Sequence, residues 1–513
     1  AVNQSITLEQ KEGQERINEP IKANPIFIKQ ENTLKFTHRV KNVLDFDRQK
    51  LLHYQPSFVG PALVKGDLNK DQREDIVLGG GQDQAIEIWL QQVNGTFKQK
   101  KSSVFSKDQN RITTEMALLD IDSDGDLDLY VANGGYHNLK SDSPVLKDQL
   151  YLNDGKGTFV RSKGKGFKTA GSGAIAANDF NQDGAIDLFV AGAVIPGSYP
   201  NRYPNSIMLN DGKGNLNVNE QLSKKVDDIE GIVRDALWTD LNEDGTQDLI
   251  LVGEWMPITV YLNLEGTLKK EENYFSNTKA KKGWWNTIKT ADLNKDGKLD
   301  FIVGNEGLNN QFKASKSQPI QIHFDDFDKN GAVDPILSYF IQGASYPLAT
   351  RDELLAQWVA LKSVYPSYES YANTDLDNLL KEHISDTTIR WEASEMESIA
   401  LLSTAEGGYS LRVLPDEVQR SPLTSILVLD LNADGNQDLI LAGNRSQNAL
   451  KIGKNESNYG TVLLGNGQGS FDVLPNRLSG LKLTGAISDL VEINWTLFVG
   501  RCAEEISLYQ RNH

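Results

Sequence analysis

The 513-residue chain has a single cysteine, Cys502, so neither an internal disulfide framework nor a cysteine-ligated zinc site can form within it. No apolar stretch approaches the roughly 20 residues that a membrane-spanning helix needs. The longest apolar stretches, such as residues 249–252 and 426–429, have the length of a strand. We therefore expect no membrane span in this chain, and its rigidity must come from something other than disulfides.

Basic residues are also in the minority. The chain has 53 Lys and Arg against 70 Asp and Glu, which gives a net charge of −17. This balance argues against nucleic acid or an anionic lipid surface as the main partner and favours the attraction of cations. The 39% hydrophobic and 24% charged fractions are those of a globular protein, so disorder of the whole chain is excluded.

What the chain has in abundance is one short repeat. The pattern Asp-x-Asn/Asp-x-Asp/Asn-Gly-x-x-Asp occurs at residues 120–128, 179–187, 240–248, 292–300, 326–334 and 430–438, and a seventh copy at 67–75 has Gln72 in place of the Gly. Most copies lie between two apolar runs, as 236–238 and 249–252 do around the third copy. Apolar runs on both sides of a tight polar loop predict two strands joined by that loop.

The spacing of the repeat indicates the fold. Successive copies from Asp67 to Asp292 begin 52 to 61 residues apart, which is room for four short strands and their turns. A second turn, Leu-Asn-Asp-Gly at 152–155 and 209–212, recurs within the unit and is typical of a hairpin. Repeated four-stranded units predict an all-β propeller with one blade per repeat.

Counting loops at 67, 120, 179, 240, 292 and 430 and a worn copy near Asp489 predicts seven blades, and eight would result if the Asp326 loop heads its own blade. We expect the propeller to span residues 31–513, with an N-terminal strand at 32–38 completing the last blade. Residues 345–391 have helical spacing and predict an insertion, with Leu354, Leu355, Trp358 and Leu361 on one apolar face. This face is expected to pack on the propeller; the alternative is that it docks a partner.

The loops themselves predict calcium sites. Oxygen ligands at positions one, three, five and nine, a carbonyl at seven and a Gly at six suit a hard cation, whereas turn chemistry alone would not repeat the same pattern seven times. We predict up to seven Ca²⁺, with the Asp67 loop weakest because Gln72 replaces the Gly. The predicted metal ligands are Asp67, Asn69, Asp71, Asp75, Asp120, Asp122, Asp124, Asp128, Asp179, Asn181, Asp183, Asp187, Asp240, Asn242, Asp244, Asp248, Asp292, Asn294, Asp296, Asp300, Asp326, Asp328, Asn330, Asp334, Asp430, Asn432, Asp434 and Asp438.

With their flanking strands, these loops resemble FG-GAP/VCBS repeats, the calcium-loop blades also found in integrin alpha-subunit propellers. Phe58-Val59-Gly60-Pro61-Ala62, Gly253-Glu254-Trp255-Met256-Pro257 and Gly304-Asn305-Glu306-Gly307-Leu308-Asn309 resemble more closely the propeller of bacterial VCBS proteins that carry an ASPIC/UnbV domain. The resemblance implies that residues 1–30 are the tail of such an upstream domain with a linker, Val2–Leu8 being its last strand. It also implies a secreted or outer-membrane-associated protein.

The loops opposite the Asp loops are the longest, and aromatic, Asn and Arg side chains on them suit a glycan or protein ligand. Packing of these aromatics against the blades is the alternative. The predicted ligand-face residues are Tyr136, His137, Tyr199, Arg202, Tyr203, Trp255, Trp284, Trp285, Asn309 and Arg445.

These observations predict a non-catalytic, calcium-stabilised binding module at the cell surface that contacts a glycan or a protein and forms part of an outer-membrane or other surface complex. A calcium-dependent polysaccharide lyase or other carbohydrate-active enzyme is the alternative, with His137 and Arg202 as base and charge stabiliser. The chain has six histidines but no His-Glu-x-x-His and no Gly-x-Ser-x-Gly, so we expect no catalytic residue.

Overall fold

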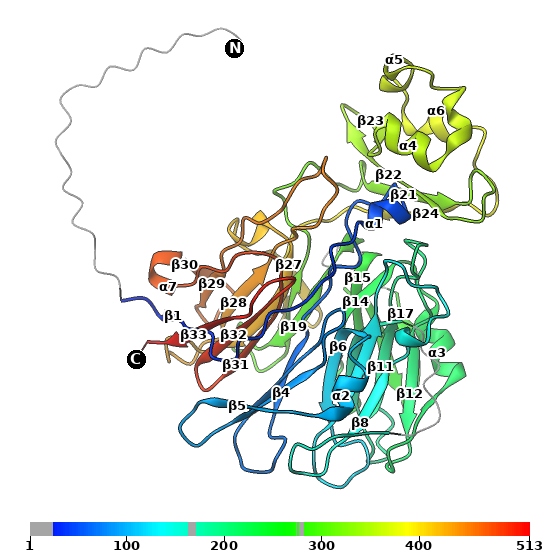
Figure 1. Ribbon diagram of the computed structural model, residues 1–513. Coiled ribbons are helices and arrows are strands. Elements are labelled where there is room, and N and C mark those ends of the chain that lie inside the picture. Colours follow the sequence, from blue (N-terminus) through cyan, green and yellow to red (C-terminus); the bar gives the residue numbers. More distant parts are fainter. Residues whose placement is uncertain (1–23, 163–170, 273, 276–281, 513) are drawn as a thin grey trace, which may run out of the picture.

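The structure is a computed structural model that describes residues 24–162, 171–272, 274, 275 and 282–512 (Figure 1). The strands of this part form eight antiparallel sheets, seven with four strands and one with five. Helices are few and short, and none in the described ranges is long and apolar enough to cross a membrane. The protein is all-β, as the repeat predicts.

Six sheets follow one another along the chain, and each begins with the strand that precedes an Asp loop. They are β2 (Leu63–Gly66), β3 (Asp75–Leu78), β4 (Glu87–Gln91), β5 (Phe97–Lys100); β6 (Ile112–Leu119), β7 (Asp128–Gly134), β8 (Gln149–Leu152), β9 (Val160–Arg161); β10 (Ser172–Asn178), β11 (Asp187–Gly192), β12 (Ser206–Asn210), β13 (Leu216–Val218); β14 (Ile232–Thr239), β15 (Asp248–Met256), β16 (Thr259–Leu264), β17 (Thr267–Glu271), with β18 (Gly283–Trp284) beside β15; β19 (Thr287–Ala291), β20 (Asp300–Gly304), β25 (Ile399–Ser403), β26 (Tyr409–Val413); and β27 (Leu423–Leu429), β28 (Asp438–Gly443), β29 (Thr461–Gly465), β30 (Phe471–Leu474).

A further sheet joins the two ends of the described chain. It contains β31 (Ile487–Ile493), β32 (Thr496–Arg501), β33 (Ser507–Arg511) and, outermost, β1 (Phe27–Gln30), which pairs antiparallel with β33. The closing strand is therefore residues 27–30 and not 32–38, and the propeller begins before residue 31. Phe27 alone in β1 is buried, so this strand lacks the apolar alternation by which a strand is predicted.

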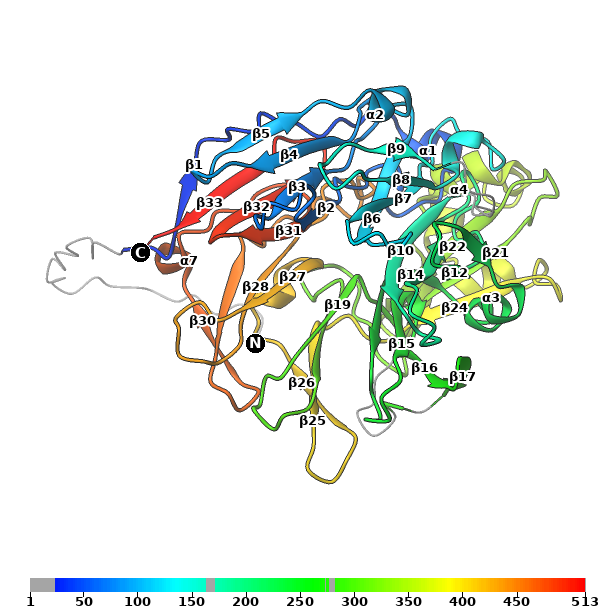
Figure 2. The same ribbon diagram turned by 90° about the horizontal axis from the view of Figure 1, so that it is seen from below.

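These seven sheets surround a common centre (Figure 2). Their first strands contact one another in the order β2, β6, β10, β14, β19, β27 and β31, and β31 contacts β2. Each second strand lies between neighbouring sheets, so strands such as β7, β15 and β28 are buried over their whole length. The closed ring leaves no first strand unpartnered and places every ring Asp loop on one face.

The eighth sheet is inserted between β20 and β25 and lies to one side of the ring (Figure 1). It contains β21 (Ile320–Asp325), β22 (Asp334–Ile341), β23 (Ala344–Pro347) and β24 (Ile389–Ala393), with α4 (Arg351–Gln357), α5 (Tyr368–Ala372) and α6 (Leu376–Leu380) between its last two strands. The insertion is thus larger than residues 345–391, and strands frame its helices. It heads no blade of the ring, because β19 and β27 contact each other directly.

The predicted apolar face of the insertion is buried. Leu354, Leu355, Trp358 and Leu361 pack with Leu51 and Ile336, and the Trp358 ring stacks on the Phe327 ring. The remaining short helices are α1 (Asp45–Arg48), α2 (Ser103–Lys107), α3 (Glu220–Asp227) and α7 (Asn476–Ser479), with single 3-10 turns at Pro144–Leu146, Val359–Lys362 and Val418–Arg420.

Residues 44–57, which we call the strap, connect the closing sheet to β2 and contain α1 (Figure 1). The Gln49 side-chain amide donates to the carbonyls of Tyr199 and Val333, so the strap lies between the ring and the inserted sheet. Farther on, the Gln55 N–H donates to the Gln447 carbonyl at 2.9 Å. The strap thus crosses the face of the ring opposite the Asp loops.

Candidate metal loops and the opposite face

Each Asp loop folds around its own first carboxylate. In the loops of β6, β10 and β14, the N–H of Gly125, Gly184 or Gly245 donates to the Oδ2 of the first Asp at 2.8 to 3.0 Å. These glycines have φ between 83° and 90°, the left-handed region that a residue with a Cβ adopts only with strain. The Gly at position six is therefore favoured in this turn, as the sequence predicts.

The Asp67 loop departs from this pattern twice. Gln72 takes the position of the Gly with φ 66° and still donates its N–H to Asp67 Oδ2 at 2.7 Å. In addition, the Arg73 guanidinium forms an ion pair with Asp71, the carboxylate at position five. Sequence reasoning identified the first departure and missed the second, which a basic residue directly after position six could have suggested. A cation in this loop would have to compete with Arg73.

The ninth residue of each loop is the buried first residue of the second strand. Asp128 accepts the Ile121 N–H on Oδ2 and the Asn153 N–H on Oδ1, at 3.1 and 2.8 Å. Burial raises the pKa of Asp128 to about 7, although the two backbone hydrogen bonds lower it. Burial likewise raises the pKa of Asp187 to about 7. Burial thus disfavours the charged form of both carboxylates more than their hydrogen bonds favour it.

The donor set fits a hard divalent cation. Buried carboxylate oxygens with no hydrogen-bond partner occur in four described loops, at Asp122 Oδ1, Asp187 Oδ2, Asp292 Oδ1 and Asp328 Oδ1. Ligand atoms of Asp120, Asp122 and Asp124 lie within 4.8 Å of one another, and so do those of Asp326, Asp328 and Asp334. A buried carboxylate oxygen without a donor is costly, and Ca²⁺ coordinated by six to eight oxygens removes that cost.

The opposite face differs from its prediction. Tyr136, Tyr199, Trp255, Trp284 and Trp285 are all at most 2% exposed, so none offers a ring to a ligand at the surface. The strap contacts three of them: the Tyr136 hydroxyl donates to Gln49, and Tyr199 and Trp284 contact the His53 ring, while Trp255 packs on Trp284. The structure contradicts the assignment of these five aromatics to an exposed ligand face.

The other predicted ligand-face residues are mostly engaged within the protein. Arg202 pairs with Asp227 and donates to the Gly231 carbonyl. His137 lies 3.3 Å from the buried Asp45, and Arg445 forms an ion pair with Glu306 at 2.9 Å. Tyr203 and Asn309 bond to neighbouring loops through the Ser141 and Arg420 carbonyls. His137 and Arg202 thus have separate partners, and no contact joins them as a catalytic pair.

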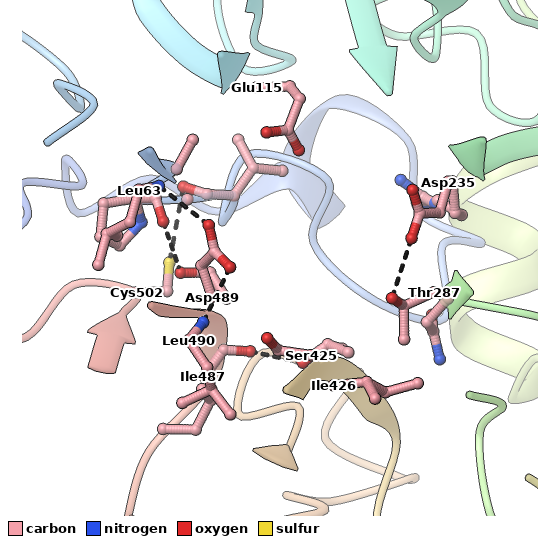
Figure 3. Close-up of a pocket in the computed structure, with 18 of the residues that line it drawn as sticks. Leu63, Glu115, Asp235, Thr287, Ser425, Ile426, Ile487, Asp489, Leu490 and Cys502 are labelled. Atoms are coloured by element: carbon pink, nitrogen blue, oxygen red, sulfur yellow. Dashed lines mark hydrogen bonds between the residues drawn. The ribbon is translucent and has the colours of Figure 1, made fainter. Parts of the chain in front are cut away.

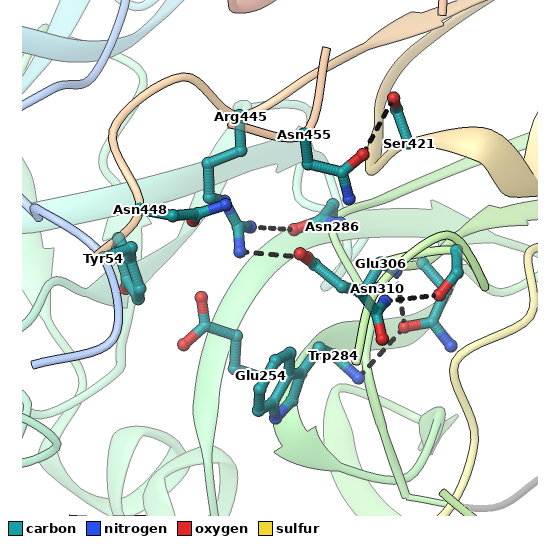
Figure 4. Close-up of polar contacts among 12 residues, drawn as sticks. Tyr54, Glu254, Trp284, Asn286, Glu306, Asn310, Ser421, Arg445, Asn448 and Asn455 are labelled. Carbon is teal, nitrogen blue, oxygen red and sulfur yellow. Dashed lines mark hydrogen bonds and ion pairs between the residues drawn. The ribbon is translucent and has the colours of Figure 1, made fainter. Parts of the chain in front are cut away.

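Of the charged residues in a polar cluster beneath the strap, the sequence analysis predicted only Arg445 (Figure 4). Arg234 bonds to Glu254 and to the Tyr54 hydroxyl, while the Arg234 and Arg445 guanidiniums lie 5.8 and 5.1 Å from the centre of the Tyr54 ring. Burial raises the pKa of Glu306 to about 7 despite Arg445. Glu254 and Glu306 belong to segments that carried the family resemblance, which was the only available signal.

Inside the ring is a channel of about 820 Å³ (Figure 3). Glu115, Asp235 and Asp489 line it from three different first strands, and Lys289 lines it from a fourth. Asp235 accepts the Thr287 hydroxyl and Asp489 accepts the Leu63 N–H, so these carboxylates bond the next sheet. Tyr54 and Gln55 of the strap line the same channel.

Comparison with known proteins agrees with the repeat. The family model of the FG-GAP-like repeat matches residues 67–131, 120–190 and 240–303. Together with the four-stranded sheets, these matches support an FG-GAP β-propeller. A search of curated protein sequences finds no match.

Solved structures with a similar arrangement include the V. cholerae biofilm matrix protein Bap1, the computationally designed Ika8 protein and the Dos1 propeller. Bap1 is 11% identical, with 93% of this chain and 90% of that chain covered and a TM-score of 0.36. Ika8 is 10% identical, with 90% and 99% covered and a TM-score of 0.36. Dos1 is 10% identical, with 91% and 97% covered and a TM-score of 0.38. Likenesses this weak carry no argument about function.

Proposed function

We propose that this protein is a non-catalytic binding module whose propeller is stabilised by calcium in its Asp loops. The observation that carries the proposal is the set of buried carboxylate oxygens without a donor, which occur in four loops at position one, three or nine. Ca²⁺ would be held by the side chains at positions one, three, five and nine, and by the carbonyl at seven. Its role is structural: it cancels the repulsion among carboxylates that the fold brings together.

The proposed location is outside the cell, either secreted or attached to the outer membrane as part of a surface complex. Loops with neutral Asn at position three, as in the copies at Asp179, Asp240, Asp292 and Asp430, have fewer charges than the Asp120 loop. Fewer charged ligands weaken calcium binding, and weak sites stay filled only where calcium is abundant, as it is outside cells. Residues 1–23 lie outside the described part, so the ASPIC/UnbV-like tail remains a prediction.

The proposed ligand is a glycan or a protein. The Asp loops occupy one face of the ring, which leaves the strap face and the loops around it for recognition. Because the predicted aromatics are buried, contact would involve the partly exposed loop residues, such as Tyr203 and Asn309. Rigid scaffolds commonly present such loops to ligands.

Affinity electrophoresis against a panel of polysaccharides, with calcium and with EGTA, tests this function when the same mixtures are assayed for cleavage. Calcium-dependent retardation without new sugar ends is the expected result for a glycan-binding module. New unsaturated sugar ends would instead establish the lyase. Failure of every polymer to retard the protein would leave a protein ligand, to be sought by co-purification from the native membrane.

A further inference from the structure

Three asparagines of the recurring third-strand turn occupy equivalent positions in successive sheets. Asn153, Asn210 and Asn263 lie at or near the end of the third strand and are buried. Their backbone N–H groups donate to the ninth-position Asp of their own loop, Asn153 to Asp128, Asn210 to Asp187 and Asn263 to Asp248, at 2.7 to 2.8 Å. Each asparagine backbone is thus attached to the Asp loop of its own sheet.

Their side chains bond the preceding sheet instead. The Nδ2 of Asn153, Asn210 and Asn263 donates to the carbonyl of Leu68, Ile121 and Phe180, respectively, at 2.6 to 2.9 Å. These three acceptors are the second residues of the preceding Asp loops. The Asn210 Oδ1 accepts the Gly212 N–H, which fixes the orientation of its amide. Each asparagine therefore bridges two adjacent Asp loops.

The bridge at Asn210 joins the two loops that point most clearly to a cation. Asp187, in the loop of its own sheet, has no exposed surface, and its Oδ2 has no partner. In the preceding loop, Asp122 Oδ1 is buried without a partner, and Asp120, Asp122 and Asp124 converge. The hydrogen bonds run from Asp187 through Asn210 to Ile121, whose own N–H donates to Asp128.

We propose that Asn153, Asn210 and Asn263 couple calcium occupancy between adjacent loops, an inference that rests on the calcium binding proposed above. An ion bound at 179–187 fixes Asp187, and through it the Asn210 turn. The Asn210 amide then holds the Ile121 carbonyl and restricts the loop at 120–128 before its own ion binds. Because linkage is reciprocal, an ion in either loop raises the affinity of the other.

The remaining ring sheets lack this bridge. Ser403 takes the place of the asparagine in the sheet of β19, and its hydroxyl bonds Asp296 and Asp300 of its own loop. The Leu241 carbonyl, which an asparagine there would bond, accepts the Tyr274 hydroxyl. In the sheet of β27 the equivalent residue is Gly465, which has no side chain to donate, and the Leu293 carbonyl of the preceding loop accepts the Gly469 backbone N–H at 3.0 Å instead. Coupling through an asparagine side chain is therefore confined to the loops that begin at 67, 120, 179 and 240.

The test counts bound Ca²⁺ by equilibrium dialysis of the full chain at free calcium near the binding midpoint. Asp183→Ala removes the carboxylate at position five of the loop at 179–187. Asp296→Ala removes the equivalent carboxylate of the loop at 292–300, which has no asparagine bridge. We expect Asp183→Ala to lower the affinity of a neighbouring bridged loop about fivefold, the low end of typical coupling, so that more calcium is lost than one half-filled loop itself holds. Asp296→Ala should lose only the calcium of its own loop, about half an ion at the midpoint.

Two variants of the bridge distinguish coupling from simple support of the fold. Asn210→Asp keeps the acceptor for Gly212 and loses the donor to Ile121, and Asn210→Ala removes both. In either background, Asp183→Ala should no longer affect the loop at 120–128. Melting of these variants in EGTA is the control that detects a general loss of stability. Equal losses of calcium for Asp183→Ala and Asp296→Ala in the natural background would overturn the coupling. An absence of bound calcium in the natural protein would overturn the proposed function itself.

Discussion

The two faces of the ring are held by contacts of different range along the sequence. On one face, each Asp loop gathers its carboxylates from nine consecutive residues and repeats the same internal hydrogen bonds. On the other face, residues 49–55 of the strap bond to backbone carbonyls that follow 150 to almost 400 positions later. Local chemistry determines the first face and long-range packing determines the second, so the two should respond differently to calcium, mutation and pH.

Removal of calcium should have the largest effect, and it should act through the loop face. If each of seven sites is filled at about ten times its dissociation constant, linkage contributes about 1.4 kcal/mol per site and about 10 kcal/mol in total. EGTA is expected to lower the melting temperature by about 10 °C or more, measured by calorimetry. A melting temperature that excess EGTA leaves unchanged would contradict the stabilising role of calcium.

Substitution of Gln357 should loosen the inserted sheet and leave the ring unaffected. The Gln357 side-chain amide donates to Asp334 at 2.6 Å, and its Oε1 accepts the Lys50 N–H of the strap. In the ring loops, the equivalent Asp instead accepts a backbone N–H from the third strand or the residue after it. Gln357→Ala leaves buried partners unsatisfied, which costs about 1 to 3 kcal/mol. We expect faster hydrogen exchange across α4 to α6.

The matched control for this substitution is Gln342→Ala, since Gln342 is an exposed residue in the turn between β22 and β23. It should not change exchange in α4. Equal protection of α4 in the two variants would show that the Asp326 loop does not hold the helix.

The strap face should respond to acid through His53. Burial lowers the pKa of His53 to about 3, with Glu254 raising it and Arg445, Arg234 and Lys451 lowering it further. The unfolded chain takes up this proton near pH 6.5 and the folded chain does not, so stability is lost as pH falls from about 6.5 toward 3. For this residue the loss approaches about 1.4 kcal/mol per pH unit.

His53→Gln should therefore flatten the pH dependence of the urea midpoint between pH 6.5 and 5, measured in saturating calcium so that the loops contribute little. A variant with the same pH slope as the natural protein would show that His53 is not kept neutral by burial.

The smallest effect is expected in the loop at 67–75, which departs from the pattern of the other Asp loops. Arg73→Ala frees Asp71 in the loop at 67–75, and removal of one partly exposed ion pair changes free energy by about 0.2 to 1 kcal/mol. Calcium affinity at this loop should rise about twofold to fivefold. This affinity is measured by isothermal titration of a variant in which position five of the other loops is substituted. An affinity that Arg73→Ala does not change would mean that Arg73 does not compete with the ion.

The same contrast explains what could be predicted from sequence. The loop at 179–187 contains its donors, its Gly and its buried Asp within nine residues, so pattern and spacing predicted both the turn and the propeller strands around it. The relay through Asn210 was visible only as a hairpin turn, because its partner Ile121 lies 89 residues earlier.

The aromatics on the strap face were assigned wrongly for a related reason. Trp255 and Trp284 lie in β15 and β18, where the sequence predicted loop residues, and no local signal indicates that His53 will stack on Trp284. Burial of a loop residue depends on which distant segment crosses it. Strand β1 escaped because its four residues contain a single buried side chain.

Anomalous diffraction from crystals grown in calcium tests the central claim most directly, since it locates each ion without reference to stability. The account predicts a peak enclosed by the carboxylates at positions one, three, five and nine of the loops at 120–128, 179–187 and 292–300, and the weakest peak at 67–75. Well-ordered loops with no peak in any of them, at millimolar calcium, would contradict it.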